Sequence, residues 1–394
     1  MHGEPALWFW AFWLSAACVV YAYVAYPLFI FAVSAKRGRP VRPGRARVTS
    51  VSVVIAAHNE QASIGRRMRE LAAMVAATGL GGEVIVVSDG STDATADIAR
   101  KPLPGAAPPV RVVELPSRQG KAAALNAGCA ASGGEVIVFA DTRQTWAADA
   151  LAMLLRNFAD PTIGAVGGEL VVETAPGVMA GVGLYWRFEK WLRRQESRWH
   201  STVGLTGAIA AVRRECFQPI PPGTILDDVY WPLRVVMQGF RVVHEAGARA
   251  FDRLPDRPRD EFRRKVRTLS SNFQLVTRLP AALLPWRNPV WFQFISHKLL
   301  RLAVPWALLA LLVSSARLNG AAYHALLAAQ LGFYAAALYG MWHGSQPRMR
   351  IAAAAASFVV LNAAAFLAFW VWASGNAGRS WTKVTYSSGP PGAA

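Results

Sequence analysis

The sequence predicts an α/β domain, built on a parallel and doubly wound sheet, that is attached to a membrane by apolar helices at both ends of the chain. Short β-rich runs alternate with helical stretches between residues 48 and about 275, and such alternation is typical of parallel sheets. Long apolar runs stand before and after this region. Hydrophobic residues make up 53% of the 394 residues and charged residues only 17%. That composition argues against an ordinary soluble domain.

The N-terminal segment, residues 1–35, is predicted to contain a transmembrane helix. Residues 7–35 carry no charged side chain, and about 20 apolar residues suffice to cross a bilayer. A signal peptide would have a shorter apolar core after a basic start. Pro27 is the expected place for a kink. The basic segment 36–47 follows, and the positive-inside rule places it and the domain after it in the cytoplasm.

The C-terminal third is predicted to cross the membrane about three more times. Before these crossings, residues 276–298 mix Pro and Trp with Arg and Lys, which is typical of a segment lying at the membrane interface. A tail, residues 375–394, follows the last crossing. The predicted spans fall within 299–374, at 299–317, 321–343 and 351–374.

The domain between the membrane segments, residues 48–275, places polar clusters after three of its predicted strands. The clusters are "HNE" at 58–60, "DGSTD" at 89–93 and "DTR" at 141–143. Ligands of parallel α/β sheets bind outside the carboxyl ends of the strands, so these clusters predict one shared site. The expected strands are 48–57, 83–88, 110–115 and 135–140, with helices over 61–77, from Ser91, and over 121–131.

Two other ligand classes fit the sequence poorly. A dinucleotide-binding oxidoreductase needs a G-x-G-x-x-G turn after the first strand, but "AAHNEQASIG" has no such turn. Nucleic acid could be attracted by the net charge of +18. The basic blocks flank apolar spans, however, and this favours a cytoplasmic membrane face instead. We therefore expect a lipid bilayer and no nucleic acid among the partners.

Six stretches follow one another along the chain: "VVIAAHNE", "SDGSTDAT", "GKAAALNAG", "VFADTR", "GLTGAIAAVRRECF" and "ILDDVYWPLRVVMQGFRVV". In this order they resemble the catalytic domain of glycosyltransferase family 2, whose membrane-embedded members include cellulose, chitin and hyaluronan synthases. The resemblance implies the GT-A fold with a mixed, mostly parallel sheet. It also implies inverting transfer of a hexose from a nucleotide-sugar, with a UDP-sugar as the expected donor. A divalent Mg²⁺ or Mn²⁺ cofactor and a bacterial inner-membrane location are expected.

The same resemblance assigns donor-binding roles by position. His58 matches the residue that packs on the nucleobase, and Glu60 belongs to its motif. Asp89 matches the acid that binds base or ribose, and Lys121 a basic residue near the nucleotide. Asp141 matches the first acid of the D-x-D motif, which binds diphosphate and metal.

Catalysis is assigned to the "LDD" motif. Asp228 matches the general base that deprotonates the acceptor hydroxyl, with Asp227 beside it. The chemistry requires these groups independently, because displacement at an anomeric carbon needs a base near the incoming hydroxyl. It also needs positive charge on the departing diphosphate.

The sequence departs from the family pattern in three places. Ser88 replaces a frequent Asp, and Arg143 replaces the second acid of D-x-D. Arg143 either faces the diphosphate or turns away and leaves a metal site with one carboxylate. The Q-x-x-R-W motif of processive synthases corresponds to "RKVRT" at 264–268. There Arg264 and Arg267 are candidates for a diphosphate clamp or for a solvated or lipid-facing basic surface.

Several alternatives remain open at this point. The acceptor is expected to be lipid-linked or a polysaccharide. A processive synthase that couples polymerisation to secretion competes with single addition, although the degenerate 264–268 motif disfavours polymerisation. A non-catalytic membrane subunit is a further alternative, which the intact "LDD" and "GSTD" disfavour. Homo-oligomers or export partners are compatible with each.

Overall fold

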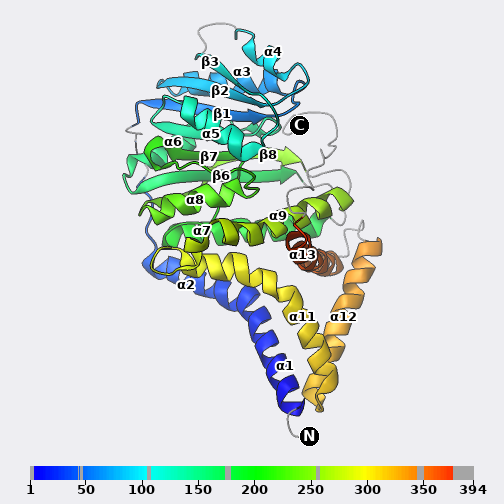
Figure 1. Ribbon diagram of the computed structural model, residues 1–394. Helices are drawn as coiled ribbons and strands as arrows, with labels where there is room; N and C mark the ends of the chain where they lie inside the picture. The colour runs from blue at the N-terminus through cyan, green and yellow to red at the C-terminus, as the bar shows by residue number, and fades with distance from the viewer. Residues whose placement is uncertain are drawn as a thin grey trace.

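The computed structural model places a sheet domain at one end of the molecule and apolar helices at the other (Figure 1). It describes residues 4–42, 44, 48–103, 108–173, 179–253, 258–343 and 350–375. The predicted basic segment 36–47 lies partly outside the described residues, and the predicted tail 375–394 lies almost wholly outside them.

The sheet of the described domain is mixed and mostly parallel, as predicted. Its strands follow the order β3-β2-β1-β4-β7-β6-β8-β5. The first four are parallel to one another, β7 is antiparallel to both of its neighbours, and β8 is parallel to β6. The strands are β1 (Ser50–Ala57), β2 (Gly81–Asp89), β3 (Val110–Leu115), β4 (Val136–Ala140), β5 (Thr145–Trp146), β6 (Ile163–Glu173), β7 (Ile209–Arg213) and β8 (Arg241–Arg253).

Alternating strand residues supply two cores, one on each face of the sheet. Val53 and Ile55 of β1 pack with α3, whereas Val54 between them packs with α5 and α8. This alternation follows from the two-residue period of a strand. The helices of the domain are α3 (Ile64–Ala77), α4 (Thr95–Arg100), α5 (Lys121–Ala131), α6 (Ala150–Leu155) and α8 (Asp227–Met237), with short 3-10 turns η2 (Arg156–Ala159) and η3 (Arg214–Cys216).

Two long amphipathic helices, α7 (Met179–Trp199) and α9 (Pro258–Arg278), lie between the sheet and the apolar helices (Figure 1). Residues 185–194 of α7 interleave Trp and Phe with Lys and Arg, which is typical of a helix at a membrane interface. The layer formed by α7 and α9 therefore separates the strand domain from the helices that are apolar enough to cross a membrane.

The N-terminal apolar segment bends instead of forming one straight helix. α1 (Glu4–Val20) passes through a π-helical turn, η1 (Tyr21–Ala25), into α2 (Tyr26–Arg37), which turns to run along α7 (Figure 1). Pro27 has no N–H to offer the carbonyl four residues before it, and missing bonds of this kind promote bends. The bend lies within six residues of the position at which the sequence predicted a kink.

The predicted interfacial segment 276–298 is not a single element. α9 continues to Arg278, and a turn, η4 (Pro280–Leu283), follows it. From Trp291 the chain is continuously helical through α10 (Trp291–Gln293), η5 (Phe294–Leu299) and α11 (Leu300–Arg317). Buried Ser296 and His297 make this stretch too polar to be recognised as part of the following span from the sequence.

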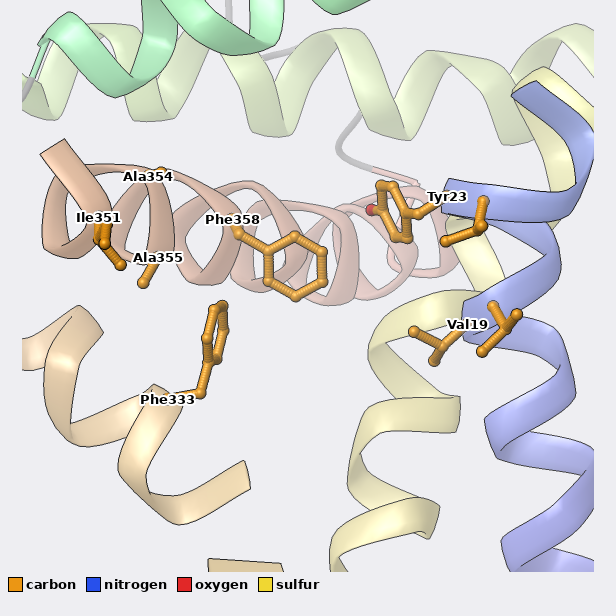
Figure 2. A pocket seen from close by; sticks show the side chains of 9 residues that line it. Val19, Tyr23, Phe333, Ile351, Ala354, Ala355 and Phe358 are labelled. Carbon is orange, nitrogen blue, oxygen red and sulfur yellow. The ribbon is translucent and has the colours of Figure 1, made fainter. Parts of the chain in front are cut away.

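Four helical segments in the described residues are long and apolar enough to cross a membrane, which agrees with the predicted number. They are 6–37, 291–317, 321–342 and 351–373. The last of these belongs to α13 (Arg350–Ala373), and the third to α12 (Ala321–His343). α13 runs across the direction of α1 and α11 and beneath α9 (Figure 2). Its Phe369 and Trp372 pack on Phe273 of α9.

Candidate active site

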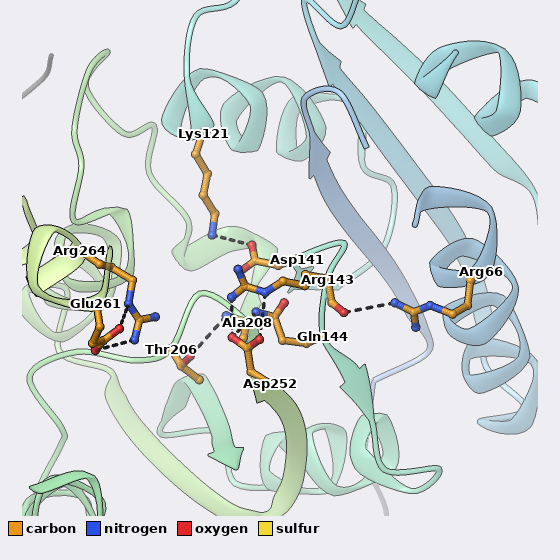
Figure 3. Close-up of polar contacts among 10 residues, drawn as sticks. All are labelled: Arg66, Lys121, Asp141, Arg143, Gln144, Thr206, Ala208, Asp252, Glu261 and Arg264. Atoms are coloured by element: carbon orange, nitrogen blue, oxygen red, sulfur yellow. Dashed lines mark hydrogen bonds and ion pairs between the residues drawn. The ribbon is translucent and has the colours of Figure 1, made fainter. Parts of the chain in front are cut away.

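One lysine joins the predicted acids at the carboxyl end of the parallel strands. Lys121 is the first residue of α5, and its Nζ donates to Asp141 Oδ1 at 2.7 Å. The same Nζ lies 4.0 Å from Asp227 Oδ2. Asp141 immediately follows β4, so the strand and the helix start are brought together (Figure 3). The three residues lie where the strand-end clusters predicted a site.

The two acids of "LDD" begin α8. Asp227 is buried and Asp228 is half-buried. Both are in the first turn, where the positive end of the helix dipole favours carboxylates. Burial nevertheless raises the pKa of Asp227 to about 7, helped by the charges of Asp228 and Asp141 and opposed by Lys121. Burial also raises the pKa of Asp228, against the positive charges of Lys121, Arg193 and Lys298. The pair therefore holds protons more tightly than free carboxyls do.

Asp89 holds the loop that leads to Lys121. Its two carboxylate oxygens accept the backbone N–H groups of Gln119 and Gly120, at 2.6 and 2.8 Å. Next to it, Gly90 has a φ of 59°, and a Cβ there would lie 2.3 Å from the backbone nitrogen of Arg118. Asp89 thus lies next to the loop before Lys121, and its carboxylate oxygens fix the start of α5 through these two hydrogen bonds.

His58 and Glu60 follow β1 at the same edge of the sheet. His58 Nδ1 lies 2.7 Å from the carbonyl oxygen of Asp89. The Glu60 carboxylate accepts a hydrogen bond from the Ser63 hydroxyl at 2.8 Å. Both side chains are half-buried. They adjoin the Asp89 loop, and their roles toward a nucleotide remain predictions.

Arg143 is directed at a carboxylate that the sequence analysis did not single out. Its Nε and Nη2 donate to the two oxygens of Asp252, on β8, at 2.9 and 2.6 Å (Figure 3). Gln144 also donates to Asp252, at 3.0 Å. Because Asp252 is buried, this fork balances a charge that would otherwise be costly. Much of the Arg143 charge is thereby neutralised within the protein.

Arg264 and Arg267 lie on α9, in the layer next to the apolar helices. Arg264 donates to both oxygens of Glu261 at 2.8 and 3.0 Å, and Figure 3 shows this pair apart from Lys121 and Asp141. The Arg267 side chain is half-buried, and its carbonyl accepts the hydroxyls of Ser270 and Ser271. The structure therefore does not bring Arg264 together with the Lys121 group.

Arg67 is a residue of this region that sequence reasoning missed. Its side chain is fully buried, stacks 4.7 Å from the Trp146 ring and donates from Nε to the Asp141 carbonyl at 2.9 Å. It fixes the backbone that carries the Asp141 carboxylate. A signal was available, because Arg67 interrupts the apolar face formed by Ile64, Met68 and Leu71.

The carboxylates of the site suit a divalent cation. Asp141 and Asp227 share Lys121, and Asp252 pairs with Arg143. No three His, Cys, Asp or Glu side chains in the described ranges are grouped to hold a metal alone. Mg²⁺ is commonly held by one or two carboxylates plus substrate phosphates. Asp141, with a third of its side chain exposed, fits the carboxylate part of that arrangement.

Residues 52–220 match the family model for glycosyl transferase family 2. The predicted resemblance to that family is confirmed. Over most of the chain the fold is similar to that of a mannosyltransferase from Pyrobaculum calidifontis, solved in complex with GDP-Man and Mn²⁺. The TM-score is 0.67 and the sequence identity 24%, with 92% of this chain and 99% of that one covered. This similarity establishes the GT-A fold for the family 2 region.

Curated relatives cover less of the chain than the structural neighbour does. An N-acetylglucosaminyltransferase of Rhizobium meliloti is 24% identical over 241 residues, which are 57% of this chain and 56% of the relative. A dodecaprenyl-phosphate galacturonate synthase of Rhizobium johnstonii is 36% identical over 104 residues, or 26% of this chain and 31% of the relative. The chain thus spans about half or less of the length of these relatives.

Proposed function

We propose that this chain is a membrane-bound inverting glycosyltransferase that moves a hexose from a nucleotide-sugar to a lipid-linked or polysaccharide acceptor. The observation that carries the proposal is the placement of Lys121 between Asp141 and the Asp227–Asp228 pair. A cation beside a strand-end acid suits a donor diphosphate, and a half-exposed carboxylate suits an acceptor hydroxyl. The family 2 match over residues 52–220 supports the same chemistry.

In the proposed reaction, Asp228 accepts the proton of the acceptor hydroxyl as its oxygen attacks the anomeric carbon. The bond from that carbon to the diphosphate oxygen breaks, and its electron pair leaves with the nucleoside diphosphate. Lys121 stabilises the departing charge. Asp227, which is more buried and closer to Lys121, holds that ammonium in place. A divalent cation bound at Asp141 would neutralise further diphosphate charge.

The bacterial inner membrane, with the family 2 domain in the cytoplasm, is the proposed location. The four apolar segments and the basic 36–47 segment support it. We propose single or short addition over processive synthesis, because Thr268 stands where the processive motif has Trp. A UDP-sugar remains the proposed donor.

Asp228→Asn tests the proposal. The variant keeps the side-chain size but cannot take a proton, so sugar transfer by the detergent-purified full chain should fall at least about a thousandfold. Nucleotide binding, measured by titration calorimetry, should change less than about threefold. Asp97→Asn, at an exposed position in a surface ion pair with Arg100, is the matched control. Full activity of Asp228→Asn would refute the assignment of the base.

A second measurement separates an enzyme from a non-catalytic subunit. Release of nucleoside diphosphate is followed with the purified chain alone and a panel of nucleotide-sugars. Release that requires no other protein supports the enzyme, whereas a chain inert toward all donors favours the subunit. Sizing of the products then distinguishes single addition from polymerisation.

A further inference from the structure

The loop between β4 and β5 carries Asp141 and is held by the helix α3. Arg67 Nε donates to the carbonyl oxygen of Asp141 at 2.9 Å. Arg66, its neighbour in the chain, donates from Nη2 to the carbonyl oxygens of Thr142 and Arg143 at 3.3 and 3.2 Å (Figure 3). Two consecutive arginines thus bind three consecutive carbonyls, and the first of these belongs to the acid that is predicted to meet the donor diphosphate.

Glu70, one turn further along α3, holds the other end of this loop. Its Oε1 accepts the backbone N–H of Trp146 at 2.7 Å and lies 2.9 Å from Arg67 Nη1. Its Oε2 accepts a hydrogen bond from Arg66 Nη1 at 3.1 Å. Residues three and four apart on a helix are neighbours on its surface, so one carboxylate can orient both guanidinium groups. We call Arg66, Arg67 and Glu70 the loop clamp.

The burial of Arg67 is costly for a residue that only stabilises the fold. Its side chain is fully buried, and its guanidinium carbon lies 4.7 Å from the centroid of the Trp146 ring. Its Nη2 has no hydrogen-bond partner in the described part of the chain. Buried ion pairs are often no more stabilising than apolar side chains of similar volume, and the buried neighbours Met68 and Leu71 are apolar. Stability alone therefore does not account for a cation at this position.

Trp146 extends these contacts from the loop clamp toward the start of β7. Its ring is buried against Arg67, and its Nε1 donates to the carbonyl oxygen of Ala208 at 3.1 Å. Ala208 ends the segment 205–208, which directly precedes β7. β4 and β7 are neighbours in the sheet. The ring therefore ties the loop that follows β4 to the segment that precedes β7.

The segment 205–208 contacts both Lys121 and Asp228. The N–H of Leu205 donates to the carbonyl oxygen of Asp228 at 2.8 Å. Gly207 lies so near Lys121 that a Cβ on this glycine would stand 2.7 Å from the lysine Nζ. A chain of direct contacts therefore runs from the loop clamp, through the buried tryptophan, to the residues beside the proposed base.

We propose that the loop clamp positions Asp141 relative to Lys121 and Asp228, and that Arg67 does so through its hydrogen bond to the Asp141 carbonyl. The clamp residues act on the backbone of the loop, so they are positioning residues. A displacement of about 1 Å can slow a reaction about a hundredfold, which explains why the loop is held at both ends. The expected effect on transfer rests on the proposed function, whereas the effect on the loop requires no donor.

Arg67→Met and Arg67→Gln test the hydrogen bond. Glutamine places an amide nitrogen where arginine has Nε, and methionine places a methyl group there, so only one of the two variants keeps the donor. In the detergent-purified full chain, kcat for sugar transfer should fall about thirtyfold in Arg67→Met and less than about fivefold in Arg67→Gln. Arg69→Met, at an exposed position of the same helix, should match wild type. Equal kcat values in the two Arg67 variants would overturn the role of the hydrogen bond.

A double variant tests whether Arg67 acts through Asp141. In a chain that already carries Asp141→Asn, the carboxylate to be positioned is gone. Adding Arg67→Met should then lower the residual single-turnover rate less than about twofold. Losses that multiply would mean that Arg67 acts independently of Asp141, and this would overturn the positioning role.

Amide hydrogen exchange of the full chain, without any donor, separates this inference from the proposed function. Arg67→Met should raise exchange in 141–146 and in 205–208 at least about tenfold, and Arg67→Gln should leave both near wild type. Unchanged exchange in both segments would overturn the clamp. Raised exchange without loss of transfer would leave the clamp a purely structural device and overturn its part in the reaction. A wild-type chain that transfers no sugar but shows the expected exchange pattern retains the clamp and loses the proposed function.

Discussion

Lys121 Nζ lies 2.7 Å from Asp141 and 4.0 Å from Asp227, so a single ammonium links the end of β4 to the start of α8. Burial lowers the pKa of this lysine, but the carboxylates around it, Asp141 first, outweigh burial and hold the net pKa above its usual value. Lys121 therefore stays charged throughout the neutral range. A permanent cation at this place suits the stabilisation of a diphosphate leaving group.

Lys121→Met should reduce kcat/KM for sugar transfer by about 100- to 1,000-fold, since a preorganised charge at the leaving group is lost. The methionine keeps the length of the side chain, so the fold should be retained. Transfer rates with a fixed acceptor provide the measurement, and the exposed Lys101→Met is the control. A loss below about threefold would remove Lys121 from the reaction.

The pH dependence of transfer should report the Asp227–Asp228 pair. With the pKa of Asp227 raised to about 7, the pair holds an extra proton in acid, and kcat/KM should rise between about pH 6 and 8. Asp227→Asn removes a negative neighbour, so the rise should move to lower pH in that variant. Profiles recorded at constant metal and ionic strength test this. A flat wild-type profile from pH 5 to 8 would contradict it.

The raised pKa of Asp227 also affects stability: the folded protein should lose stability as pH rises, over the range in which activity increases. Because the folded-state pKa of Asp227 lies above its usual 3.8, the folded protein binds more protons than the unfolded chain between about pH 4 and 7. This contribution to stability is complete below pH 3.8 and is lost as pH rises through 7. Thermal unfolding of Asp227→Asn should accordingly depend less on pH across that window than wild type.

Chelation should stop turnover. Arg143 is engaged by Asp252, and Lys121 is shared between carboxylates, so these two side chains neutralise only part of the charge of a diphosphate. EDTA should abolish nucleoside diphosphate release, and added Mg²⁺ or Mn²⁺ should restore it. With a single carboxylate ligand, half-maximal recovery should need metal in the millimolar range. Undiminished activity in EDTA would mean that Lys121 and Arg143 suffice.

The Arg143–Asp252 fork should contribute to stability as a pair. Arg143→Leu leaves the buried Asp252 without its fork and should lower the free energy of unfolding by about 2 kcal/mol. Adding Asp252→Asn should recover part of that loss, because no buried charge then remains. Denaturant unfolding of both singles and the double variant measures the coupling. Strictly additive losses would show that the two residues act independently.

Much of the domain was predictable from local pattern. The strand predicted over 83–88 lies within β2, and the strand predicted over 135–140 begins one residue before β4. Uninterrupted runs of β-branched residues favour the strand conformation, so these two strands could be predicted closely. The helix predicted over 61–77 begins only at Ile64, since Gln61 to Ser63 form a turn. The number of membrane-length apolar segments was also evident, because hydropathy is a property of the local sequence.

The strand-end acids could be located from the sequence, but their partners could not. Asp141 and Lys121 are separated by twenty positions, and Arg143 and Asp252 by far more. Such pairs depend on strand order and on which helix start faces which strand. The sequence shows that Arg143 replaces the second acid of D-x-D. It does not show that Arg143 pairs with the buried Asp252.

The sequence by itself determined the α/β character of the domain, its apolar flanks and the acids at the strand ends, because each depends on nearest-neighbour chemistry. Only the tertiary structure decided that α13 lies across α1 and α11, that Asp89 holds the loop before Lys121, and that Arg143 meets Asp252. These relationships arise from packing between distant segments, and one-dimensional periodicity carries no information about which distant surfaces meet.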